Sequence, residues 1–141
     1  MNKKNILIFL LIMVSGTSQI FSQTKPAIMK KARVEVFYFH PNERCPIDQS
    51  IEDATRKLMQ TDFAGQIRKG IVKFQVINTD DKTQAKTVGR FEINAQALYI
   101  VTSDKGKEIK KDLTEFAFSN AQGNPGRFKT GLKQEILDAM K

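Results

Sequence analysis

Hydrophobic positions along the chain gather in short continuous runs that predict β-strands. Runs rich in β-branched and aromatic residues occupy residues 34–39, 71–77 and 97–102, a composition that strands favour. The first run is almost continuously apolar, which is typical of a strand covered on both faces. A tight turn at residues 104–107 predicts that residues 108–111 pair back as a short edge strand.

Other hydrophobic positions recur at the spacing of an α-helix. One helix is expected to begin near Cys45 and Pro46, because proline suits the first helical position. A second long helix is expected to start at Pro125. The apolar stripes of these two helices are formed by Ile47, Ile51, Ala54 and Leu58, and by Phe128, Leu132, Ile136 and Met140. Shorter helical segments are predicted at residues 63–67 and 82–90.

The order of these elements predicts an α/β domain. A strand–helix–strand unit implies a right-handed crossover and parallel pairing of its two strands. The hairpin later in the chain adds an antiparallel edge strand. We therefore expect a four-stranded mixed sheet with helices on both faces.

The first residues carry the three-part pattern of a secretory signal peptide. A basic start with Lys3 and Lys4 precedes an unbroken apolar run at residues 6–14, and small polar residues follow. The run is too short to span a bilayer, which needs about 20 residues; an uncleaved membrane anchor is the alternative. Cleavage is expected after Ser18 or near Gln23.

We therefore divide the chain into a signal peptide at residues 1–23, a linker at residues 24–32 and one domain at residues 33–141. No other stretch has the sequence of a membrane-spanning segment. The roughly 118 residues that remain after processing are enough to bury a core. The leader predicts a periplasmic or secreted protein of a bacterial envelope.

The basic charge of the chain does not indicate nucleic-acid binding. The formal net charge is +8, and loss of the two lysines in the leader leaves a basic domain. The lysines are spread along the chain without an aromatic-rich basic stripe. A local cluster at the predicted hairpin consists of Lys105, Lys107, Lys110 and Lys111. Such charges commonly solvate the edge of a sheet, although a basic face also attracts acidic partners or a membrane surface.

Cysteine usage is unusual for an exported protein, which often carries an even number of cysteines in disulfides. This chain has one, Cys45, so no internal disulfide can form. Its thiol is therefore buried, reactive or paired with another molecule. The sequence has no nucleophilic serine turn, no phosphate-binding loop, no His-Glu-x-x-His zinc motif and no flavin- or nicotinamide-binding motif. No cofactor is predicted. The helix carboxylates Asp48, Glu52 and Asp53 fit a solvated helix start.

The most informative segment joins the first predicted strand to the first helix. The strand at residues 34–40 ends at His40, and Arg44-Cys45-Pro46-Ile47-Asp48 opens the helix. This arrangement, with residues 88–93 before the third strand, resembles the thioredoxin-like superfamily, in which a Cys-x-x-Cys motif opens this helix. The chain most resembles a group of exported bacterial proteins labelled nitrophenyl compound nitroreductase subunit family. The resemblance implies a thioredoxin-like fold and, from the label, a part in a reductase complex.

Two departures from the thioredoxin-like pattern affect the expected chemistry. Asp48 stands where the motif has its second cysteine. The position of the superfamily's cis-proline falls at Ala97, after Gln96. Because a cis bond before a residue other than proline costs about 2.5–4 kcal/mol, we expect a trans bond and a differently shaped loop.

The single thiol limits the reactions open to this site. A dithiol enzyme needs a second sulfur to resolve the mixed disulfide that the first one forms, so dithiol–disulfide oxidoreductase activity is excluded. A monothiol role stays open, because a helix N-terminus and Arg44 would stabilise a thiolate. Asp48 opposes it by like charge. Such a thiol would form a mixed disulfide with a protein or a small thiol.

His40 is the only histidine of the chain and lies close to Cys45 in the sequence. It would act as a base or orient the thiol, or it would be a plain loop contact. His40, Cys45 and Asp48 are all ligand types, but three of them without closed spacing are a weak metal signal. No metal is predicted.

Two functions follow from these observations. The first is a non-catalytic module that uses the groove around Cys45, Gln96 and Ala97 to hold an extended segment of another exported protein. The alternative is a monothiol redox protein, accessory to another envelope oxidoreductase. In both, His40, Arg44 and Asp48 also belong to the binding surface.

Overall fold

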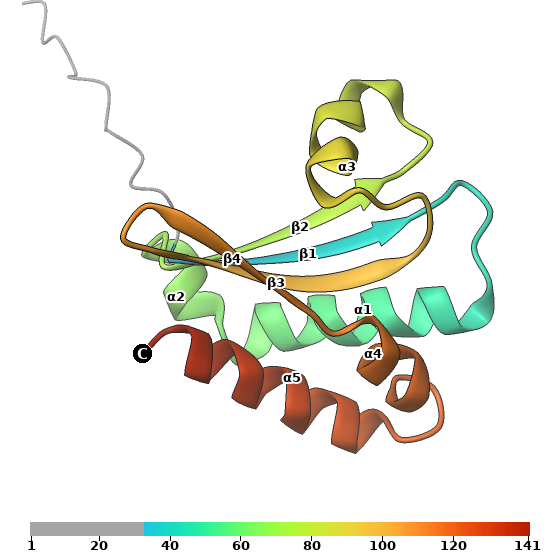
Figure 1. Ribbon diagram of the computed structural model, residues 1–141. Helices are drawn as coiled ribbons and strands as arrows, with labels where there is room; N and C mark the ends of the chain where they lie inside the picture. Colours follow the sequence, from blue (N-terminus) through green and yellow to red (C-terminus); the bar gives the residue numbers. More distant parts are fainter. Residues whose placement is uncertain (1–32) are drawn as a thin grey trace, which may run out of the picture.

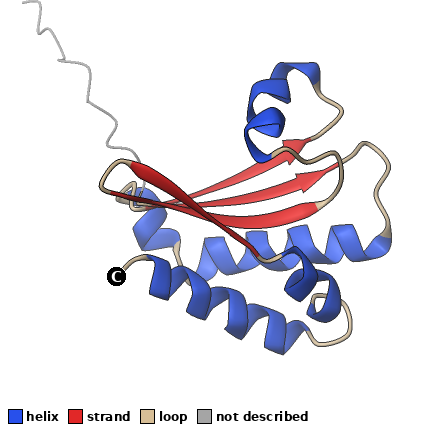
Figure 2. Ribbon diagram, in the orientation of Figure 1, coloured by secondary structure: helices blue, strands red, loops and turns tan. Residues whose placement is uncertain are grey.

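Four strands form one mixed sheet in the computed structural model of the protein, which describes residues 33–141 (Figures 1 and 2). The strands are β1 (Val34–His40), β2 (Val72–Asn78), β3 (Ala97–Asp104) and β4 (Lys107–Asp112). Their order in the sheet is β2-β1-β3-β4. The β1–β2 pair is parallel, and the other two pairs are antiparallel. The predicted four-stranded mixed α/β sheet is confirmed, while the predicted signal peptide and linker lie outside the described residues.

Helices cover both faces of this sheet. They are α1 (Pro46–Thr61), α2 (Ala64–Arg68), the 3₁₀ turn η1 (Lys82–Gln84), α3 (Ala85–Phe91), α4 (Thr114–Asn120) and α5 (Pro125–Ala139). Figure 1 shows α1, α4 and α5 on one face and α3 on the other. The helix expected at residues 82–90 is divided into η1 and α3. Helix α4 was not predicted from the sequence.

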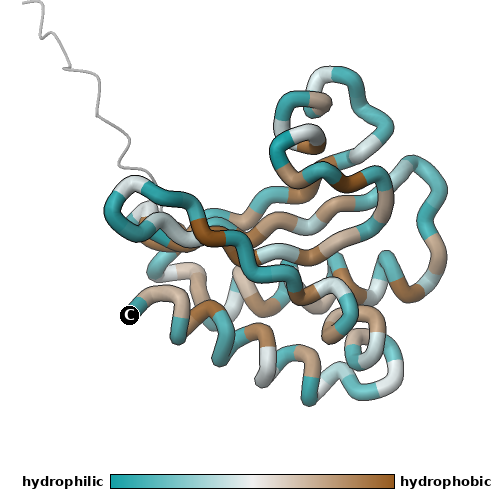
Figure 3. The backbone as a smooth tube through the Cα atoms, in the orientation of Figure 1, coloured by the Kyte–Doolittle hydropathy of each residue, from teal (hydrophilic) through white to brown (hydrophobic). Residues whose placement is uncertain are grey.

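The central strand β1 is buried on both faces, as its continuous apolar run predicts. On one side Val34, Val36 and Tyr38 join the larger core cluster with α1 and α5. On the other side Phe37 and Phe39 pack against the α3 segment. This alternation follows from the pleat of the strand. In Figure 3 hydrophobic stretches lie along the strands and helices, and the hairpin tip is hydrophilic.

Both core clusters are built from residues within the described part of the chain. Between residues 33 and 141 no helix combines the length and apolar character that crossing a membrane requires.

The hairpin between β3 and β4 has the turn that the sequence predicts. Lys105 and Gly106 both have positive φ, at 46° and 82°. Two successive left-handed residues make the turn whose twist matches that of the flanking strands. Glycine takes this conformation without strain, so Gly106 fixes the position of the turn.

Candidate functional site

Cys45 lies at the N-terminus of α1, just beyond the end of β1. It is the N-cap residue, with φ −84° and ψ 165°, and Pro46 follows at the first helical position. The helix therefore begins where the sequence predicts. The cysteine is free and exposed. Of the three states expected for this thiol, burial is excluded.

Asp48 closes the first turn of α1 from the inside. Its Oδ2 accepts a hydrogen bond from the Cys45 N–H at 2.9 Å and another from Gln96 Nε2 at 3.0 Å. The Tyr38 hydroxyl donates to the Asp48 carbonyl oxygen at 2.8 Å. Burial opposes ionisation of Asp48, but the donors from Cys45 and Gln96 hold the pKa of this carboxyl below its ordinary value. Asp48 is thus a buried, ionised structural residue.

The expectation that the first-helix carboxylates are solvated is wrong for two of the three. Asp48 and Glu52 are buried, whereas Asp53 is exposed. Positions four apart share one face of a helix, and this face of α1 also carries the core residue Ile51. The carboxylates are tolerated there because each has hydrogen-bond donors.

Glu52 holds the Arg44 side chain. Its carboxylate forms ion pairs with Arg44 and, at 2.5 Å, with Arg56. Burial opposes ionisation of Glu52, but these hydrogen bonds keep its pKa below the ordinary value. The Arg56 guanidinium also lies over the Phe74 ring, 5.7 Å from its centroid. Arg44 therefore neutralises a buried carboxylate of α1 and is already engaged in the described structure.

His40 ends β1 and contacts its own loop. Its Nδ1 lies 2.8 Å from the carbonyl oxygen of Pro41. Because that carbonyl only accepts, Nδ1 is the donor. The ring stacks on Tyr38, with centroids 6.1 Å apart. Within residues 33–141 no three His, Cys, Asp or Glu side chains gather in a group that could hold a metal ion.

Gln96 and Ala97 take different places at the start of β3. The Gln96 side chain reaches α1 through its bond to Asp48. Ala97 is buried in the other core cluster, beside Phe37 and Phe39. No peptide bond is cis in the described part of the chain, so the bond before Ala97 is trans, as expected. Of this pair, only Gln96 joins the site at Cys45.

No known family model and no curated protein matches this chain. The likeness to thioredoxin-like proteins therefore rests on the residues quoted for it, from the end of β1 to the start of α1. The mixed sheet is established independently of that likeness.

Tyr38 and Glu52 are parts of the site that the sequence did not reveal. In the sequence, Tyr38 looks like one more apolar member of the β1 run. In the structure its hydroxyl pKa is raised, mainly by burial and also by the nearby Asp48 charge. From the sequence, Glu52 is an ordinary acid near the start of α1. The only sequence signal for its burial is that it stands four residues after Asp48, on the same helix face.

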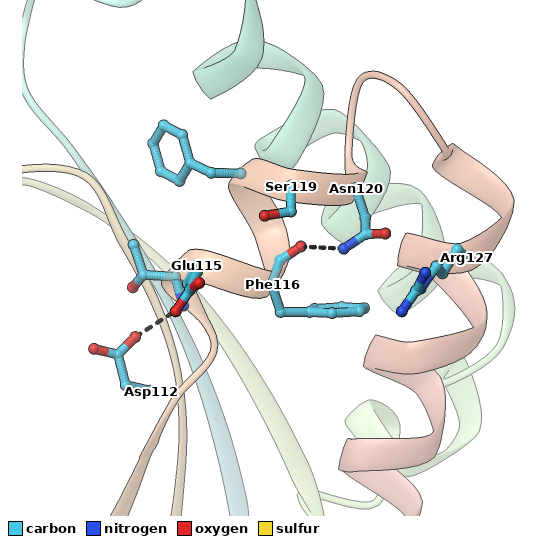
Figure 4. Close-up of a pocket in the computed structure, with 8 residues that line it drawn as sticks. Asp112, Glu115, Phe116, Ser119, Asn120 and Arg127 are labelled. Atoms are coloured by element: carbon cyan, nitrogen blue, oxygen red, sulfur yellow. Dashed lines mark hydrogen bonds between the residues drawn. The ribbon is translucent and has the colours of Figure 1, made fainter.

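A separate depression of about 850 Å³ lies beside α4 and the start of α5 (Figure 4). It is lined by Asp112, Thr114, Glu115, Phe116, Phe118, Ser119, Asn120 and Arg127. Figure 4 shows the Asp112 and Asn120 side chains in hydrogen bonds to nearby main-chain groups. None of the lining residues belongs to the predicted site. The depression is wide and open, so it does not enclose a ligand.

Proposed function

We propose that this protein is an exported, thioredoxin-like binding module that lacks the resolving cysteine and holds a partner protein non-catalytically at Cys45. The observation that carries the proposal is an exposed Cys45 on a rigid base formed by Asp48 and Gln96. The β2-β1-β3-β4 sheet and the helix that follows β1 support the thioredoxin-like part. The leader supports the periplasm or the outside of the cell as its location.

The position of the missing cysteine supports binding over dithiol catalysis. Asp48 is buried, and its carboxylate caps α1 and anchors the loop before β3. A resolving group must reach a disulfide and supply a second sulfur. Asp48 does neither, so the site presents one thiol on a fixed surface.

The proposed binding surface consists of groups around the thiol. His40 lies at the end of β1 and Gln96 in the loop before β3; both are half-buried, and Ala95 is exposed next to Gln96. Arg44 and Asp48 support this surface from within. An extended segment of another exported protein is the expected partner.

A photo-crosslinker attached to Cys45 tests this proposal. The unique thiol accepts a maleimide–benzophenone directly, and the matched control carries the same group on Lys107→Cys in a Cys45→Ser background, at the far end of the sheet. We expect one exported protein to crosslink from Cys45 only. The purified partner should bind the wild type and Ala85→Arg, which is substituted on α3, and should not bind Ala95→Arg. Equal crosslinking from both positions contradicts the proposal.

The exposure of Cys45 also favours the alternative, a monothiol redox protein. In that reaction the thiol attacks a disulfide R–S–S–R′, forms Cys45–S–S–R and releases R′–SH, so that electrons and protons balance. A partner thiol then resolves the mixed disulfide. The acceptor is a disulfide of an envelope protein or of a small thiol.

Alkylation of the folded protein against pH separates the two functions. A labelling midpoint well below about 8.5, the value of a free cysteine, together with a mixed disulfide formed from oxidised glutathione, supports the monothiol reaction. Ordinary thiol reactivity, with no mixed disulfide formed, supports the binding module over the redox protein. The Cys45→Ser variant supplies the blank in both measurements.

A further inference from the structure

The end of the molecule farthest from Cys45 gathers basic side chains from separate parts of the sequence. Parallel pairing places the starts of β1 and β2 together, and Val34 of β1 also pairs with Thr102 of β3. Figure 1 shows the β3–β4 hairpin and α2 at this same end. The exposed cations there, which we call the basic end, are Arg33, Arg68, Lys69, Lys73, Lys105 and Lys107.

Within residues 33–141 none of the cations of the basic end forms an ion pair. The neighbouring Lys110 and Lys111, by contrast, pair with Glu108 and Glu135. Lys105 and Lys107 are exposed without such a pair, which fits solvation of the sheet edge and also leaves them accessible to an anionic partner.

Exposed apolar side chains accompany this charge. The two large hydrophobic residues that are exposed in the described part of the chain are Ile67, at 36%, and Ile109, at 50%. Ile67 lies in α2, next to Arg68, and Ile109 lies in β4 opposite Thr102. Cations beside exposed aliphatic groups match a surface that rests on anionic headgroups and inserts apolar groups at their boundary.

We propose that the basic end docks the protein onto an anionic phospholipid surface. Sites for single-stranded nucleic acid use exposed aromatic side chains as stacking platforms. The large exposed hydrophobic residues of the described chain are both isoleucines, which favours lipid over nucleic acid. Docking in this orientation directs Cys45 away from the membrane, toward soluble partners. The inference does not depend on the chemistry of Cys45.

A tryptophan reporter tests the docking. The chain has no tryptophan, so Ile67→Trp provides a single fluorophore at the basic end and Lys86→Trp provides the control on α3. Residues 24–141 are used, because this form contains both core clusters and no apolar leader. Vesicles of phosphatidylcholine are compared with vesicles that contain about 30 mol% phosphatidylglycerol, an anionic lipid.

We expect the Ile67→Trp emission to shift to the blue on anionic vesicles only, with a shift that added salt reverses. The Lys86→Trp emission should stay unchanged. A shift at both positions, or at neither, would overturn the proposed orientation.

Charge variants separate the basic end from the net charge of the protein. The first variant combines Arg68→Gln, Lys69→Gln, Lys105→Asn and Lys107→Gln; asparagine tolerates the left-handed backbone at position 105. The matched control removes the same charge elsewhere, with Lys57→Gln, Lys82→Gln, Lys86→Gln and Arg127→Gln. Circular dichroism and thermal unfolding establish that both variants fold.

Co-sedimentation with the anionic vesicles then measures how strongly each variant binds. Each lysine or arginine near such a surface contributes roughly fivefold in affinity, so removal of four should weaken binding by roughly several hundredfold. The control should bind within about threefold of the wild type. Equal losses in both variants would overturn the proposal. Binding to an acidic protein or to DNA with the same dependence, but not to vesicles, would also overturn it and assign the basic end to that partner.

Discussion

The side chain of Gln96 donates to Asp48 Oδ2 at 3.0 Å and so joins the loop before β3 to the first turn of α1. The same oxygen accepts the Cys45 N–H. One buried carboxylate thus fixes the backbone of the exposed cysteine relative to the central sheet. The position of the thiol is set by a contact between residues 48 apart in the sequence.

Removing this contact should destabilise the fold, and a double-mutant cycle can separate the contributions of Asp48 and Gln96 from the coupling between them. Asp48→Ala should lower the free energy of unfolding by about 2–3 kcal/mol, because it removes a helix cap and leaves buried donors unpaired. Gln96→Ala should cost about 1 kcal/mol, and the two changes should couple by about 1 kcal/mol. Urea unfolding measures all four proteins. Asp53→Ala, at an exposed position of the same helix, is the control and should stay within about 0.5 kcal/mol; purely additive losses would contradict a direct bond.

Glu52→Gln should be more damaging than its position in the first turns of a helix suggests. The substitution leaves two guanidinium groups around a neutral amide, and Arg44 is only partly exposed. Breaking a buried pair on one side costs about 3–5 kcal/mol, and the exposure of Arg56 reduces the expected loss to about 2–3 kcal/mol. Urea unfolding checks this value. Asp53→Asn serves as the matched exposed control, and a loss equal to that of this control would show that the Glu52 pairs are not formed in solution.

The two buried carboxylates should also make stability depend on pH. The pKa values of Asp48 and Glu52 are lowered in the folded protein. A lowered folded pKa gives stability that is present above the unfolded values, about 3.9 and 4.3, and is lost as the pH falls toward the folded values. We therefore expect the free energy of unfolding to decrease from about pH 5 to about pH 3. The Asp48→Asn, Glu52→Gln double variant should show a shallower decrease, and an unchanged slope would assign the acid sensitivity to other groups.

Gly131→Ala should destabilise α5 although alanine favours helices. An added Cβ would lie 2.4 Å from Phe116 Cζ, and the Phe116 ring stacks on Phe128 with centroids 5.9 Å apart. Moving this ring costs about 1–3 kcal/mol, which exceeds the gain in helix propensity of about 1 kcal/mol. Thermal unfolding measures the net loss. Gly89→Ala in α3 has open space around its Cβ and should be neutral or stabilising; a stabilised Gly131→Ala would show that Phe116 is free to move.

Local patterns were sufficient to predict the sheet and the start of α1. Strand β1, the start of α1 and the hairpin turn could be predicted because each depends on residues close in sequence. These are the apolar run of β1, Pro46 and Gly106. Helix α4 could not, because it has only seven residues and its N-cap, Leu113, makes no side-chain cap. Its helical state depends on packing against α5, which local propensity does not contain.

Burial at the candidate site depended on contacts between distant residues. An acid in the first turn of a helix is stabilised by the helix dipole in water, and nothing in the local pattern indicates that Asp48 is buried. Its partners Tyr38 and Gln96 come from two other strands and their loops. The basic end is similar, because its cations are separated by tens of residues and only the parallel β1–β2 pairing and the hairpin bring them together.

Restoring a second cysteine tests how Cys45 and residue 48 are placed. In Asp48→Cys the new thiol occupies the third helical position, inside the turn that Cys45 caps. Mild oxidation should produce an intramolecular disulfide, detected as a loss of 2 Da by mass spectrometry and as protection of both thiols from alkylation. The variant should also unfold at lower urea concentration when reduced, because the cap that Asp48 provides is gone. Gln49→Cys is the matched control: its side chain is exposed on the outer face of α1 and should remain free under the same oxidation. A disulfide in the control, or none in Asp48→Cys, would contradict the inward placement of residue 48 beneath the exposed cysteine.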